Sequence, residues 1–164
     1  MLQASLSRWK DPAAWRRVWM HGSLASLLSA AVLAWRGRAE TGHAAAALNA
    51  PSHWLWGRRA LRRNDASLRH TLPGIAIHHA SSLFWALFYE GLQSRRRRVT
   101  PAGAMADAAA VTAVAALVDL RLVPERLTPG FERRLSARSL SGVYLGFAAG
   151  LALGGLLVRQ SRAA

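Results

Sequence analysis

The chain contains no cysteine, which excludes disulfide bonds, thiol catalysis, thiolate metal sites and haem attachment through a CxxCH motif. Acidic residues are scarce, because 8 Asp and Glu stand against 22 Lys and Arg and give a formal net charge of +14. Such a charge suits either nucleic acid or anionic lipid head groups. No recognisable nucleic-acid-binding module surrounds the basic residues, so we expect lipid, and not nucleic acid, as the partner.

The most informative absence is that of Lys and Arg from four long stretches of the chain. All 22 basic residues lie outside four windows of 18 to 25 residues. About 20 apolar helical residues cross the hydrocarbon layer of a membrane, whereas a soluble bundle places charges along each helix. We therefore predict one all-α domain over 1–164, an integral membrane bundle of four transmembrane helices. The predicted spans are 18–35, 71–93, 102–122 and 139–158, and Thr100 with Pro101 marks the start of the third.

The connector between the first two spans contains an apolar stretch, 42–57, that is too short to cross comfortably and is broken by Pro51. Proline favours the first turn of a new helix, and Trp54 and Trp56 precede a run of arginines. We expect an amphipathic helix over about 49–63, either interfacial or re-entrant. If 42–57 crossed as well, the chain would cross five times, so the number of crossings and the orientation stay open. A second short surface helix is expected to begin at Thr128 and Pro129.

Gly142, Gly146, Gly150 and Gly154 repeat every four residues in the fourth span. This spacing places them on one helix face, where another backbone can approach closely. We expect this face to pack against the alanine-rich third span, or to join copies of the chain into a homo-oligomer.

The second span carries polar side chains at helical spacing on two neighbouring stripes. A polar stripe in a lipid-exposed helix should face the interior, where it can bind a ligand, carry protons or hydrogen-bond neighbouring helices. An Asp at mid-depth costs about 2.5 to 3.5 kcal/mol, so the one in the third span should lie near a surface, be protonated or find a partner. The candidate ligand- or proton-binding residues are His53, His78, His79, Ser82, Tyr89, Glu90, Asp107, Asp119 and Arg121.

Catalytic and metal-binding patterns are missing from the sequence. No serine lies in a nucleophile elbow, and no glycine loop precedes a helix in the way a phosphate site requires. His78 and His79 are adjacent on a helix and point about 100 degrees apart, so they do not both reach one metal ion. We predict no enzyme activity, no catalytic residue, no metal and no cofactor, with haem or quinone as the cofactors left open.

Three stretches, NAPSHWLWG (49–57), LPGIAIHHASSLFWALFYE (72–90) and VDLRLVPERLTPGFERRLS (118–136), together resemble an uncharacterised family of small bacterial polytopic integral membrane proteins. The resemblance implies a multi-pass protein of a bacterial inner (cytoplasmic) membrane and supplies no activity. We expect a structural or accessory protein that binds lipid or a membrane partner. The alternatives are a proton or small-ion conduit along the polar stripe of the second span, and a haem- or quinone-binding redox component. The ligand, the partner protein and the oligomeric state stay open.

Overall fold

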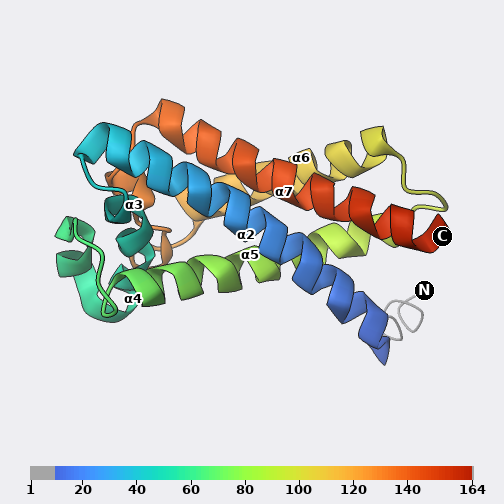
Figure 1. Cartoon of the computed structure of the whole chain (residues 1–164), viewed down its shortest axis with the longest axis horizontal. Coiled ribbons are helices and arrows are strands. Elements are labelled where there is room, and N and C mark those ends of the chain that lie inside the picture. Colours follow the sequence, from blue (N-terminus) through green and yellow to red (C-terminus); the bar gives the residue numbers. More distant parts are fainter. Residues whose placement is uncertain (1–9, 164) are drawn as a thin grey trace.

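The structure, a computed structural model, describes residues 10–163, and every element within that range is helical (Figure 1). This confirms the predicted all-α class. α2 packs against both α5 and α7, whereas α6 packs mainly against α7 and also contacts α5. The four long helices are α2 (Pro12–Thr41), α5 (Thr71–Gln93), α6 (Pro101–Leu117) and α7 (Ala137–Ala163).

Local sequence signals start two of the long helices. The Asp11 carboxylate accepts a hydrogen bond from the Ala13 N–H at 2.9 Å, and Pro12 occupies the first turn of α2. The Thr100 hydroxyl accepts from the Gly103 N–H at 3.0 Å at the start of α6, as the sequence predicts.

Three helices are long and apolar enough to cross a membrane: Pro12–Thr41, Pro101–Leu122 and Ala137–Val158. They contain the first, third and fourth predicted spans. The second predicted span forms α5 over the same residues, 71–93, but is not among the three. Two adjacent histidines and two serines in its middle lower its mean hydropathy, so length and composition alone do not mark it.

The connector between α2 and α5 differs from the single amphipathic helix predicted over 49–63. Gly57, with φ of +65°, interrupts the helical segment. The first half of the connector packs against α2 and α5, and the choice between an interfacial and a re-entrant helix stays a prediction. The pieces are α3 (Ala45–Asn49), η2 (Ala50–Ser52), α4 (His53–Trp56) and η3 (Gly57–Arg62).

The connector between α6 and α7 also differs from its prediction. α6 continues into one π-helical turn, η4 (Val118–Leu122), and two short 3₁₀ turns follow: η5 (Glu125–Leu127) and η6 (Phe131–Arg133). Thr128 is extended and Gly130 has φ of +84°, so no helix begins at Thr128 and Pro129. Phe131 is buried and belongs to a core cluster with Leu33 of α2.

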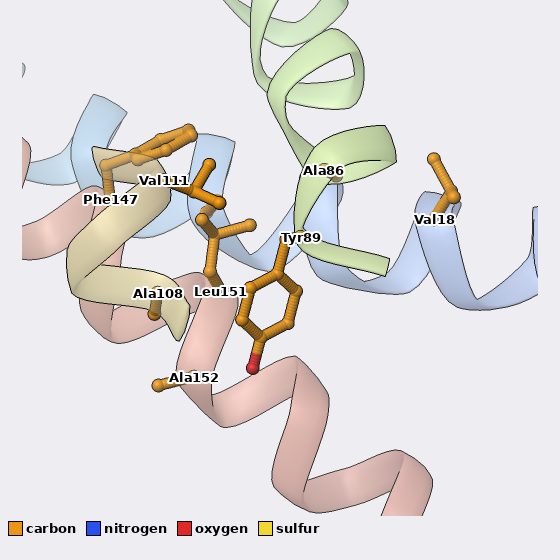
Figure 2. Packing of buried hydrophobic residues seen from close by; sticks show 9 residues of the cluster. Val18, Ala86, Tyr89, Ala108, Val111, Phe147, Leu151 and Ala152 are labelled. Carbon is orange, nitrogen blue, oxygen red and sulfur yellow. The ribbon is translucent and has the colours of Figure 1, made fainter. Parts of the chain in front are cut away.

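All four long helices contribute to the main core cluster. Tyr89 of α5 lies fully buried beside Leu151 of α7, as Figure 2 shows. Small side chains, such as Ala86 and Ala108, fill the space around them and allow the helices to approach.

The glycine face of α7 packs against α2, not against α6 as the sequence suggested. A Cβ placed on Gly150 would lie 2.5 Å from the backbone nitrogen of Ala25, and one on Gly154 would lie 2.9 Å from the Cα of His21. The four-residue spacing of the glycines identifies a face for close packing, but it does not identify the helix that packs against that face. The face expected to join copies of the chain is covered by α2 of the same chain.

Gly150→Ala should destabilise the fold by about 1 to 3 kcal/mol, because its Cβ would force the α2 backbone away. Gly142→Ala is the matched control on the same face, since its Cβ would meet only a Val32 methyl group at an ordinary 3.7 Å. Helix propensity should make that control neutral or slightly stabilising. Unfolding in mild detergent measures both variants, and equal losses of stability would contradict the α2–α7 packing.

Candidate functional site

A cavity of about 530 Å³ lies between α5 on one side and the ends of α6 and α7 on the other. We call it the His78 cavity. Ala80 and Phe84 line it and are exposed, so it opens to the outside along α5. Residues from both connectors close it, among them Trp54 and Leu127. Most of its lining is apolar, and its polar side chains are Ser29, His78, Ser81, Ser82, Asp119 and Tyr144.

The hydrogen bonds around His78 are the basis for assigning its tautomer. Its Nε2 lies 2.8 Å from the Ser29 hydroxyl oxygen, and that hydroxyl donates its own proton to the Ala25 carbonyl oxygen at 2.7 Å. With the hydroxyl proton used in this way, we assign the ring proton to Nε2, which then donates to Ser29. In the neutral ring this leaves Nδ1 as an acceptor, on a residue that lines the cavity.

Tyr144 and Asp119 form the polar group of the opposite wall. The Tyr144 hydroxyl donates to Oδ2 of Asp119 at 3.3 Å, and both residues line the cavity. Ser82 donates to the carbonyl oxygen of His78 at 2.8 Å, so its proton is engaged within α5. The cavity thus offers an imidazole on one wall and a phenol with a carboxyl group on the other, within an apolar lining. This arrangement suits an apolar molecule that carries few polar atoms.

Glu90 belongs to a separate cluster between α2 and α5. Its Oε1 accepts a hydrogen bond from Nε of Arg17 at 2.7 Å, and its Oε2 lies 3.2 Å from Nε2 of His21. The Glu90 and His21 side chains are 2% and 1% exposed, so the carboxylate is buried against its partners. Glu90 lies twelve residues after His78, about 18 Å along the helix axis, and so outside the cavity.

Asp107 is buried and has charged and polar partners. The Arg96 guanidinium holds it with a two-pronged contact, Nε to Oδ2 at 2.7 Å and Nη2 to Oδ1 at 2.6 Å. The Gln93 amide also donates to Oδ2, at 2.8 Å. These hydrogen bonds and the negative charge raise the pKa of Arg96 above its ordinary value. The contacts join the end of α5 to the start of α6.

The remaining predicted residues lie apart from one another. The His79 ring packs against Trp19, with ring centroids 5.9 Å apart, and the Tyr89 hydroxyl donates to the Ala104 carbonyl oxygen at 3.3 Å. Arg121 is exposed. His53 is buried and lines a different, basic pocket. Of the nine candidates, His78, Ser82 and Asp119 meet at the cavity.

Sequence reasoning missed His21, Arg17 and Tyr144. Arg17 and His21 are four residues apart, so they share a helix face, and that spacing was the available signal. Nothing local marks Tyr144, because its partner Asp119 is brought to it by the fold.

Within residues 10–163, no group of three or more His, Asp or Glu side chains is arranged to hold a metal ion. Comparison of the chain with protein-family models, with curated proteins and with solved structures gives no match. The resemblance carried by the three sequence stretches stays a prediction, and the function is argued from the site alone.

Glu90→Gln should lower the free energy of unfolding by about 3 kcal/mol, because Arg17 and His21 lose the buried negative charge between them. Asp65→Asn is the control, since the Asp65 side chain is 92% exposed and its pair with His43 should contribute less than about 1 kcal/mol. Denaturant unfolding in mild detergent compares the two variants. Equal stability of Glu90→Gln and the parent would mean that the buried cluster does not hold α2 to α5.

Proposed function

We propose that the chain is a non-enzymatic four-helix membrane protein that binds a lipid, or another largely apolar molecule, in the His78 cavity. The observation that carries the proposal is the cavity itself: about 530 Å³, apolar, and open along one helix. Ligand sites commonly occupy about 300 to 1,000 Å³ and combine an apolar lining with a few polar groups.

The outer surface supports a lipid environment. Large apolar side chains are exposed on each of the long helices, including Trp35 at 67% and Leu145 at 69%. Exposed apolar surface of this extent is unfavourable in water and suits hydrocarbon. The polar side chains of α5 have partners on α2 and α6 or line the cavity, which suits a fourth span whose outer face is apolar.

The cavity supports ligand binding better than ion conduction. Glu90 and Asp107 are already engaged by arginines, and among the described residues no hydrogen bond connects them to His78. A continuous relay along α5 would need such connections. A quinone would suit the same cavity, because it is also an apolar molecule with a few carbonyl oxygens. The quinone-binding alternative therefore differs from the lipid proposal only in the identity of the ligand.

Native mass spectrometry of protein extracted in mild detergent tests the proposal. The parent should retain one small-molecule adduct per chain, and Ala80→Trp should reduce its occupancy at least tenfold by filling the mouth of the cavity. Ala76→Trp is the matched control, one helical turn earlier on α5, exposed and outside the cavity lining. The adduct mass separates a phospholipid from a quinone. No adduct on the parent, or equal occupancy in both variants, would contradict the proposal.

A further inference from the structure

A second pocket, of about 440 Å³, lies at the same end of the molecule and is lined by charged residues. We call it the arginine pocket. Three arginines and a single acidic residue line it, so its net formal charge is positive. Its lining is His53, Gly57, Arg58, Leu61, Glu125, Arg126 and Arg133.

The arginine pocket and the His78 cavity lie on two sides of the same short segments. In α4, Trp54 lines the cavity while the preceding His53 lines the arginine pocket. In η5, Leu127 lines the cavity and Arg126 the arginine pocket. The Trp54 indole N–H donates to the Thr128 carbonyl oxygen at 2.9 Å and ties the two segments together. An apolar site and a basic site are therefore neighbours across a thin wall.

Glu125 holds two of the arginines in place without using up their donors. Its Oε1 accepts from Nη2 of Arg58 at 2.6 Å and lies 2.8 Å from Nη2 of Arg133. Arg133 also forms an ion pair with Glu132, whose Oε1 lies 3.8 Å from its Nε. Each guanidinium has five N–H donors, so donors remain on both groups for another acceptor. The hydrogen bond from Arg58 keeps the pKa of Glu125 below its ordinary value, so the bridge persists at neutral pH.

Arg126 supplies a cation that the fold does not use. Its side chain is exposed and has no hydrogen-bond or ion-pair partner among the described residues. Two oriented guanidinium groups and a third unpaired one around a hollow match an anion with several oxygen atoms. Phosphate is such an anion, because its oxygens accept the paired N–H groups of arginine.

We propose that the arginine pocket binds a phosphate group, carried by an anionic phospholipid head group or by a free phosphorylated solute. Trp56 precedes Gly57 of the pocket, and its indole N–H donates to the Arg69 carbonyl oxygen. Tryptophan is enriched at the membrane–water interface, at the level of the lipid head groups. The head-group source rests on the proposed membrane function, whereas the phosphate site rests on the pocket's own residues.

The test compares two triple variants that remove the same charge. Arg58→Gln with Arg126→Gln and Arg133→Gln empties the pocket of cations. The matched control replaces three exposed arginines at the other end of α5, Arg95→Gln with Arg97→Gln and Arg98→Gln. Native mass spectrometry in mild detergent measures retention of phosphatidylglycerol against phosphatidylcholine. The parent and the control should prefer phosphatidylglycerol at least tenfold, and the pocket variant should lose that preference.

Equal retention of the two lipids by the parent, or equal loss of preference in both triple variants, would overturn the proposal. Should the triple pocket variant fail to fold, Arg126→Gln alone replaces it, because Arg126 has no partner to lose, and a several-fold loss of preference is expected. A folded pocket variant that keeps the preference for phosphatidylglycerol over phosphatidylcholine would also overturn the proposed phosphate site.

Calorimetry identifies the source of the phosphate. Binding of inorganic phosphate alone, lost in the pocket variant, would support a site for free phosphorylated solutes. Binding of short-chain phosphatidylglycerol without binding of inorganic phosphate would support a head-group site. Binding of neither would overturn the proposal. Ala80→Trp should leave the phosphatidylglycerol preference unchanged, so failure of the cavity proposal and failure of the phosphate site are distinguishable.

Discussion

The close approach of α2 to its neighbours is the constraint on which the rest of the structure depends. On one side, α7 presents glycines to the α2 backbone. On the other side, a Cβ on Gly22 would lie 2.9 Å from the Cα of Leu83 in α5. α2 therefore separates α5 from α7 over much of their length, and α5 and α7 make few contacts with each other. The space left between them near the two connectors is the His78 cavity.

The two ends of α5 have different roles. Buried charges hold one end, where Glu90 is joined to α2 and Gln93 meets Asp107 of α6. The other end lies against the short helices of the first connector, and the middle of α5, around His78 and Ser82, borders the cavity. Ion pairs with buried carboxylates resist displacement, because separating them leaves an uncompensated charge. The ion-paired end can thus hold the helices together beside the cavity, where we propose that a ligand binds.

The long helices were readable from the sequence because an absence of Lys and Arg over 18 residues or more is a strong local signal. The polar stripe of α5 was also readable, since helical spacing places His78 and Ser82 on one face. The cavity was not, because its closing residues come from connectors without a periodic pattern. The partner of the glycine face was not readable either, since the spacing of Gly150 and its neighbours describes one helix and the identity of the second depends on the whole fold.

The hydrogen bond between Trp54 and Thr128 has a consequence for synthesis of the protein. The two residues are 74 positions apart in the chain, and each lies in a connector that helps to close the cavity. Contacts of such high sequence separation carry a large loop-closure entropy cost, which the intervening helices reduce once they have formed. Tyr144 and Phe147 of the last helix complete the lining. The His78 cavity is therefore incomplete on a nascent chain that lacks the last helix, and the ligand proposed above would bind only the completed chain.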